Sequence, residues 1–153
     1  MTVFGDPRIR RVPVVECHEP LIDLRGIEAL RVAHPTGARL RRGVVDRLVA
    51  AQTLLRTDLR LMVVEGFRPP PPPILCVDPD AHGSGAAVDL TLCTPSGVEL
   101  VRGQESSSVL GAALSAVGLV NYDAEWWHWS YGDRHWAFAT GAVSARYGPV
   151  TVP

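Results

Sequence analysis

The sequence has almost no net charge, few cysteines and no long hydrophobic run. Its 15 Lys and Arg residues nearly balance its 16 Asp and Glu residues, for a formal net charge of -1. A chain with this balance has no electrostatic preference for nucleic acid or for an anionic membrane surface. No apolar run approaches the roughly 20 residues that cross a bilayer, and the first residues lack the apolar core of a signal peptide. We therefore expect a cytoplasmic protein that binds neither membranes nor nucleic acid.

Cysteine is scarce, and its positions argue against a disulfide framework. The three cysteines, Cys17, Cys76 and Cys93, form no CxxC pair. An odd number without paired spacing is typical of reduced thiols in a cytoplasm. Each thiolate is a possible zinc ligand, but free cysteine more often packs in a core as a small hydrophobic residue. Core packing is therefore the favoured interpretation.

The chain does contain enough apolar material for one folded domain over residues 1–153. Hydrophobic residues make up 46% and charged residues 20% of the chain, as in soluble globular proteins. Apolar spacing predicts helices at residues 43–56 and 106–117, the second capped by the serines at 106–108. Alternating or continuous apolar runs predict strands at residues 12–16, 59–67, 86–93, 98–101, 125–131 and 135–139. Strands with segregated helices indicate an α+β fold, with a mainly antiparallel sheet and helices packed on one side.

The predicted strand at 86–93 carries an aspartate in an otherwise apolar stretch. Val88, Leu90 and Leu92 share one face of this strand, because successive side chains alternate. Asp89 lies on the other face, where its carboxylate needs a partner, since an unpaired buried charge is costly. A metal ion is one such partner, and an ordinary polar contact within the sheet is the other.

Three further residues can complete a metal site with Asp89. His82 precedes it by seven residues, with two glycines between them that allow a tight bend. Glu125 and His128 are three residues apart, a spacing that brings both to one site in a twisted or bulged strand. Two imidazoles and a carboxylate leave the fourth position of a catalytic zinc open. Taken singly, His82 is more typical of a surface histidine and Glu125 of a paired surface acid, so the combination carries the metal hypothesis.

The segments around these residues resemble the motifs of one enzyme family. The stretch DAHGSGAAVD at 80–89 resembles the S-x-H-x-x-G-x-A-x-D motif of the zinc-dependent D-alanyl-D-alanine dipeptidases, the VanX-like peptidases. EWWH at 125–128 resembles their E-x-W-H motif, and VVEGFRP at 63–69 resembles their strand ending in G-[YF]-R-P. The three motifs occur in the family's order, and the resemblance covers most of residues 16–138. The chain is thus identified as a shortened member, with an expected hedgehog/DD-peptidase-like fold.

The resemblance implies a zinc metallopeptidase that hydrolyses small dipeptides of the D-Ala-D-Ala type, a peptidoglycan building block. By position in the motifs, His82, Asp89 and His128 look like the ligands of one zinc ion per chain, and Glu125 looks like the catalytic base. Arg68 looks like the arginine that stabilises the developing oxyanion, a role in which a fixed cation is effective in a water-poor site. Without the resemblance, a salt bridge at a strand end would be the expected role of Arg68.

The sequence departs from the family around the substrate pocket. Asp80 replaces the motif's serine, and Ser84 replaces the arginine that commonly precedes the motif's glycine; both are candidate substrate-binding residues. The long family segment before the first zinc histidine is reduced to the proline-rich residues 69–81, and a segment after the aspartate strand is absent. The pocket should therefore be more open. Two alternatives follow: a trimmed enzyme for another small amide or a biosynthetic step, and a zinc-binding module without turnover.

Other notable residues have simpler interpretations. The arginines within residues 39–42 form a local basic cluster that is expected to be solvated at the start of a helix. The prolines at 69–73 indicate a polyproline II connector, with an SH3 or WW ligand as the alternative. Trp127 and Trp129 are expected in the core, because they lie on the strand face opposite the histidine between them. His135 is expected at the surface or behind the metal ligands, rather than as a fourth ligand.

Overall fold

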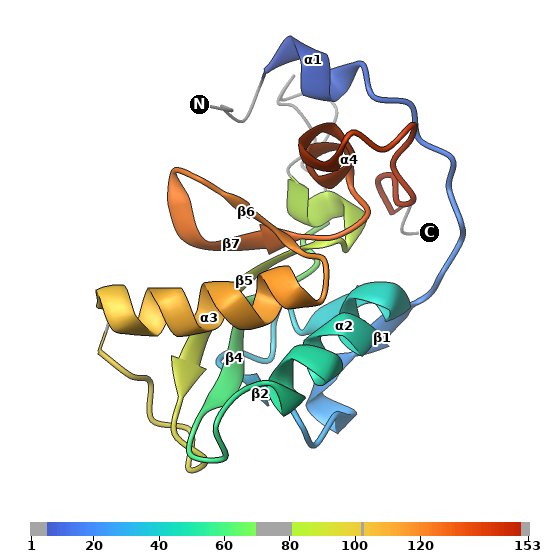
Figure 1. Cartoon of the computed structure of the whole chain (residues 1–153). Helices are drawn as coiled ribbons and strands as arrows, with labels where there is room; N and C mark the ends of the chain where they lie inside the picture. Colours follow the sequence, from blue (N-terminus) through green and yellow to red (C-terminus); the bar gives the residue numbers. More distant parts are fainter. Residues whose placement is uncertain (1–5, 70–80, 102, 151–153) are drawn as a thin grey trace.

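The computed structural model describes residues 6–69, 81–101 and 103–150, which form one α+β domain (Figure 1). Its helices are α1 (Pro7–Arg10), α2 (Arg42–Thr53), α3 (Gln104–Ala116) and α4 (Arg134–Thr140), with short 3-10 turns η1 (Leu24–Gly26) and η3 (Ala81–Ser84). Its strands are β1 (Leu21–Asp23), β2 (Arg31–Val32), β3 (Arg39–Arg41), β4 (Arg60–Glu65), β5 (Ala87–Cys93), β6 (Val120–Tyr122) and β7 (Glu125–Ser130). None of these helices has the length and apolar composition needed to cross a membrane.

Five strands form the main sheet, in the order β2-β4-β5-β7-β6. β2 runs parallel to β4, and the other three pairs are antiparallel. β1 and β3 form a separate antiparallel pair. The nearly continuous apolar run of β4 predicted an interior strand, and β4 does lie between β2 and β5. The prediction of a mainly antiparallel sheet in an α+β domain is confirmed.

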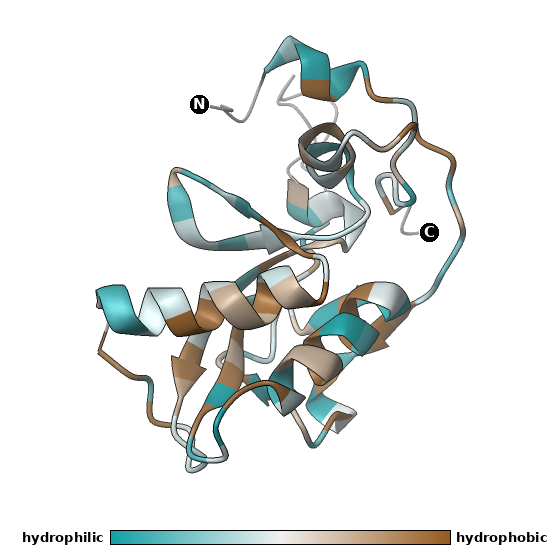
Figure 2. Cartoon of the chain, viewed as in Figure 1, coloured by the Kyte–Doolittle hydropathy of each residue, from teal (hydrophilic) through white to brown (hydrophobic). Residues whose placement is uncertain are grey.

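Helices α2 and α3 lie side by side on one face of this sheet and cover the hydrophobic core (Figure 1). Fully buried leucines from both helices and both central strands meet there: Leu48, Leu61, Leu90, Leu110 and Leu114. Figure 2 shows α2 as a mixture of hydrophilic and hydrophobic residues, as expected for a helix with one buried face. Because Val88 and Leu90 belong to this core, the alternating Asp89 points to the opposite face of the sheet. The candidate site therefore lies on the face away from α2 and α3.

The aromatic segment at 135–139 is helical, so the predicted strand there is wrong. The Asp133 carboxylate accepts a hydrogen bond of 2.8 Å from the backbone N–H of Trp136, which caps the first turn of α4. The helix ends at Gly141, whose φ of 72° is the left-handed conformation that closes many helices. Aromatic content favoured a strand, but these two caps determine a helix. β7 pairs instead with β6, a three-residue strand that the sequence did not indicate.

Two other predicted strands are reduced to isolated bridges. Segment 12–16 forms one bridge, to Ala145, and segment 98–101 forms one bridge, to Cys93. The serines at 106–108 do not cap α3, which begins two residues earlier. The hydroxyls of the last two serines donate to carbonyl groups one turn back in the helix. The other predicted helices and strands are found within a few residues of their expected bounds.

Candidate metal centre

His82 lies in the turn η3, just before the chain enters β5. Its side chain is buried, and its Nδ1 lies 2.8 Å from the carbonyl oxygen of Gly66. Because a carbonyl oxygen only accepts hydrogen bonds, Nδ1 carries a proton, and Nε2 is the ring nitrogen that faces the other residues of the group. This Nε2 lies 3.4 Å from Oδ1 of Asp89. A hydrogen bond to the far nitrogen is the usual way in which a protein orients an imidazole toward a metal.

Tertiary hydrogen bonds fix the loop that carries His82. The four successive carbonyl groups of residues 82–85 each accept a hydrogen bond from a distant segment. The donors are the backbone N–H groups of Arg68, Val150 and Arg41 and the Nε of Arg41, at 2.8 to 3.2 Å. The position of His82 is therefore set by the folded domain and not by the local sequence alone.

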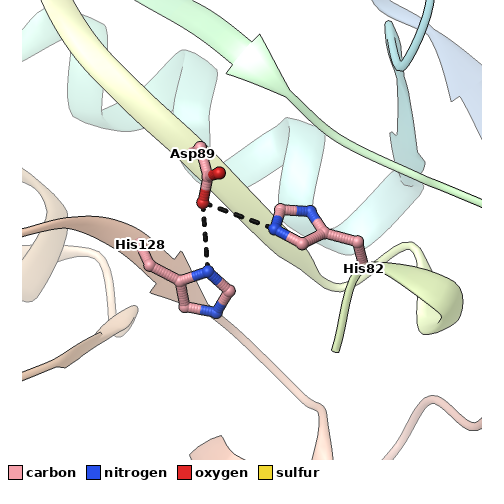
Figure 3. A group of neighbouring side chains, drawn as sticks. All are labelled: His82, Asp89 and His128. Carbon is pink, nitrogen blue, oxygen red and sulfur yellow. Dashed lines mark hydrogen bonds and ion pairs between the residues drawn. The ribbon is translucent and has the colours of Figure 1, made fainter. Parts of the chain in front are cut away.

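Asp89 and His128 face each other across neighbouring strands. They are register partners of β5 and β7, and Nδ1 of His128 lies 3.0 Å from Oδ1 of Asp89. His128 is 2% exposed, so the pair is largely screened from solvent. One oxygen of Asp89 thus contacts nitrogens of both imidazoles, as the dashed lines of Figure 3 show.

The spacing of the three predicted ligands suits a tetrahedral metal ion. One ligand atom from each of His82, Asp89 and His128 lies within 4.8 Å of the others, and two of the separations are 3.0 and 3.4 Å. Zinc holds nitrogen and oxygen ligands at about 2.0–2.1 Å, which places neighbouring corners of a tetrahedron about 3.3 Å apart. Imidazole and carboxylate are also ligands that zinc accepts readily. The residues predicted from the sequence therefore form a buried group that could hold one metal ion.

Hydrogen bonding keeps the Asp89 carboxylate charged. Burial alone would raise its pKa, but hydrogen bonds from His128 and His82 and the charge on those rings outweigh burial and lower the pKa to about 2. An anion in this position is stable only with positive charge beside it, from ring protons or from a cation. At neutral pH the group therefore presents an anionic ligand between two imidazoles.

Glu125 lies beside the ligand group. Its Oε2 is 3.9 Å from Nδ1 of His128, and its side chain is 37% exposed. Residues three apart in a regular strand point to opposite faces, but the pairing of β6 with β7 shifts register next to Asn121. This irregularity brings both side chains to one site, as the sequence hypothesis required. A carboxylate near the ligands and open to water has the position of a general base.

Arg68 contacts the loop of His82 through its backbone and Glu65 through its side chain. Its N–H lies 3.2 Å from the His82 carbonyl oxygen, and two guanidinium nitrogens lie 2.8 and 2.6 Å from the carboxylate oxygens of Glu65. Glu65 is the register partner of Asp89, so this ion pair lies at the border of the centre. The salt bridge expected for an arginine at a strand end is present, and the oxyanion role stays a prediction.

The candidate substrate-binding residues are placed differently. Ser84 is 8% exposed, and its hydroxyl donates to the Ala81 carbonyl and accepts from the Ala86 N–H, so it stabilises the turn. A contact between Ser84 and substrate stays a prediction. Asp80 lies outside the described residues, as do the prolines at 70–73.

Within the described part of the chain, neither His135 nor a cysteine joins the ligand group. His135 is buried in α4, and burial lowers its pKa. It packs edge-on against Tyr122, which also packs edge-on against His128, so His135 lies behind the candidate ligands, as one of the two predictions expected. Cys93 is a buried free thiol and Cys17 an exposed one, and Cys76 is not among the described residues.

The tryptophans of β7 only partly follow simple alternation. Trp129 is in the core at 5% exposure, as predicted. Trp127 is partly exposed and lies outside the core cluster, so that prediction is wrong. Trp126 packs against the core instead, because the irregular pairing of β7 breaks the alternation between Glu125 and His128.

Two residues that support the site were not recognised in the sequence. Arg41 belongs to the cluster at 39–42 that was expected to be solvated, yet it is 5% exposed and forms an ion pair of 2.9 Å with Glu16. Asn121 donates from its side-chain nitrogen to backbone carbonyl groups of β7. Nothing in the spacing marks Arg41, and the only hint for Asn121 is that it is the sole asparagine of the sequence.

Comparison with protein-family models and with curated proteins finds no match for this chain. The residues themselves carry the evidence for function. They define a single α+β domain that carries a buried His-Asp-His group able to hold a metal ion.

Proposed function

We propose that the protein is a zinc metallopeptidase that hydrolyses small dipeptides of the D-Ala-D-Ala type. One observation carries this proposal: His82, Asp89 and His128 converge within 4.8 Å, with the Glu125 carboxylate 3.9 Å from His128. A structural metal site needs no carboxylate of this kind, half-exposed and adjacent to the ligands. Three protein ligands with a general base beside them are instead the arrangement of hydrolytic zinc enzymes.

The chain's own residues divide the work between holding the metal and moving a proton. Bound zinc would act as a Lewis acid and lower the pKa of water toward about 7. Glu125 takes one proton from the water that attacks the amide carbon. It then delivers that proton to the leaving nitrogen as the C–N bond breaks, so that one carboxylic acid and one amine are released. The exposed fraction of Glu125 allows both substrate and water to reach it.

Arg68 supplies positive charge at the border of the site. Its guanidinium is held in a two-point contact by Glu65, and such contacts fix orientation better than a single hydrogen bond. The proposed role is stabilisation of negative charge on the carbonyl oxygen during attack. Replacing Arg68 by lysine keeps the charge but loses the planar fork, so we expect turnover to fall while zinc binding is kept.

A substrate of the D-Ala-D-Ala type follows from the resemblance of the three motifs to those of the dipeptidases. The shortened pocket segments favour a more open site, which weakens strict selection of a free dipeptide. Ser84, in place of the family's arginine, has its hydroxyl engaged in the η3 turn. A different small amide is the second candidate, and a panel of substrates separates the two.

The test combines metal analysis with a screen of D- and L-dipeptides. We expect about one zinc per chain in the parent protein, loss of zinc in His128→Ala, and retained zinc without hydrolysis in Glu125→Gln. The exposed His34 and Glu99 offer matched controls: His34→Ala should keep zinc, and Glu99→Gln should keep activity. Release of D-alanine supports the dipeptidase. If other amides are cleaved and D-alanine is not released, the result supports the second candidate. Zinc binding without any cleavage, or the absence of zinc binding, contradicts the proposal of a zinc enzyme.

A further inference from the structure

The pairing of β6 with β7 contains an unusually large interruption. Val120 lies opposite Ser130 and Asn121 opposite Trp129, but the next residue, Tyr122, lies opposite Glu125. One step along β6 therefore corresponds to four steps along β7, so the register between the two strands skips residues 126–128. β7 nevertheless stays in register with β5 at residues 128–130. The interruption is thus confined to the segment that begins with the proposed base and ends with a proposed metal ligand.

One side chain replaces the missing ladder contacts. The amide nitrogen of Asn121 lies 3.0 Å from the carbonyl oxygen of Glu125 and 2.9 Å from that of His128. The carbonyl oxygen of Trp126 is 3.4 Å away and completes the contacts. A primary amide has two N–H donors on one nitrogen, so Asn121 can hold both ends of the bulged segment at once. An aspartate in place of Asn121 would have no N–H donor, and a serine would have a single donor on a shorter side chain.

We propose that Asn121 is a positioning residue that sets the distance between the general base Glu125 and the metal ligand His128. Residues three apart can share a site only if the strand between them is bulged. A bulge removes ladder hydrogen bonds, and unsatisfied carbonyl groups at its ends would favour a regular strand. Asn121 satisfies those two carbonyl groups and so stabilises the bulged form. The inference rests on the proposed function for its consequence in catalysis, but the effect on β7 is independent of metal.

The test compares Asn121→Ala with Gln52→Ala. Gln52 is a matched control, because its side-chain amide also bridges two backbone groups, donating to the Leu59 carbonyl at 2.9 Å and accepting from the Leu61 N–H at 2.8 Å. It lies on α2, on the face of the sheet opposite the metal centre. Asn121→Ala loses the contacts of one amide nitrogen with three carbonyl groups, and Gln52→Ala loses two hydrogen bonds. Both variants should therefore unfold at lower urea than the parent. If Asn121→Ala does not fold, Asn121→Ser, which keeps one donor, replaces it in both measurements below.

The first measurement uses metal-free protein and follows hydrogen exchange of the backbone amides at 125–129. Faster exchange there in Asn121→Ala, with parent-like exchange in Gln52→Ala, supports the inference. Equal protection in all three proteins overturns it. This measurement decides the inference even if the parent protein binds no zinc, a result that would refute the proposed function alone.

The second measurement is a cobalt titration followed by the visible absorption of the bound ion, which reports ligand geometry. Disturbing a residue that orients metal ligands costs about 10- to 100-fold in metal affinity, so Asn121→Ala should bind cobalt at least tenfold more weakly, with an altered spectrum. Gln52→Ala should match the parent in both. Parent-like affinity and spectrum in Asn121→Ala, or equal weakening in Gln52→Ala, would refute the positioning role. Cobalt binding as expected without any hydrolysis would refute the peptidase and leave this role standing.

Discussion

Replacing Arg41 by alanine tests whether a buried charge cluster supports the candidate metal centre. The guanidinium makes five hydrogen bonds, two to the carboxylate of Glu16 and one each to the carbonyl groups of Glu19, Ser84 and Gly148. It is 5% exposed. The side chain therefore joins the loop that carries His82 to segments near both ends of the described chain.

The expected loss of stability follows from the burial of the two charges. Breaking a buried ion pair by removing one partner costs about 3–5 kcal/mol, because the other charge is left uncompensated. Glu16 is less buried than Arg41, with 24% of its side chain exposed, and it keeps hydrogen bonds from the N–H groups of Gly148 and His18. Both facts reduce the penalty, while three carbonyl groups lose a charged donor. We expect Arg41→Ala to lower the free energy of unfolding by about 3 kcal/mol.

The assay is urea unfolding of metal-free protein, with Arg42→Ala as the matched control. Arg42 is the next residue in sequence, is exposed, and should change stability by no more than about 0.5 kcal/mol. Zinc affinity of Arg41→Ala should fall as well, since the Ser84 carbonyl next to His82 loses its donor. A loss below about 1 kcal/mol, or equal effects in the two variants, would show that the cluster does not hold the fold together.

Three further predictions concern the loop, the acid range and the metal. Gly85→Ala should destabilise the protein more than Gly97→Ala. Both glycines have positive φ, of 69° and 91°, but an added Cβ would lie 2.5 Å from the Leu21 side chain at position 85 and in open space at position 97. Similar unfolding midpoints for the two variants would contradict this prediction. Burial alone would raise the pKa of Glu16, but backbone hydrogen bonds and the Arg41 charge lower it. Because the folded pKa is then below the unfolded value of about 4.3, Glu16 stabilises the fold above that pH and this stability is lost as pH falls through the lowered pKa. Glu16→Gln should therefore be less stable than the parent at neutral pH, and the difference should shrink on acidification. Zinc at 100 times its dissociation constant should raise the free energy of unfolding by about 2.7 kcal/mol, and a chelator should reverse the gain; an unchanged midpoint would argue against specific binding.

The residues of the candidate metal group could be predicted from the sequence because both their chemistry and their short-range spacing indicated them. Few roles besides metal binding commonly require two histidines and an aspartate together, as at positions 82, 89 and 128. The glycines near His82 indicated the bend that follows it. The alternation around Asp89 gave its strand face correctly, since a strand's period of two is a local property. For the same reason the α+β class and the interior position of β4 followed from apolar patterns alone.

What escaped prediction depends on long-range contacts or on competing local signals. Arg41 is buried by contacts with Glu16 and Gly148, which are 25 and 107 positions away in the sequence. The residues next to Arg41 in the sequence therefore do not indicate its burial. The prediction for Trp127 is wrong because it assumed regular alternation, whereas the pairing of β7 with β6 is interrupted on this segment. The aromatic content of residues 135–139 favours a strand, but the competing local signals, the capping residues Asp133 and Gly141, determine a helix.

The hydrogen bond from Val150 to the Gly83 carbonyl, with that from Arg41 to Gly148, has a consequence for biogenesis. During translation, His82 and Asp89 leave the ribosome well before residues 148–150 do. The loop of the first ligand cannot adopt its final shape until those late residues arrive to secure it. Metal loading is therefore expected only after residues 148–150 have emerged, and a nascent chain stalled before residue 148 should retain a metal ion poorly even though it already carries His82, Asp89 and His128.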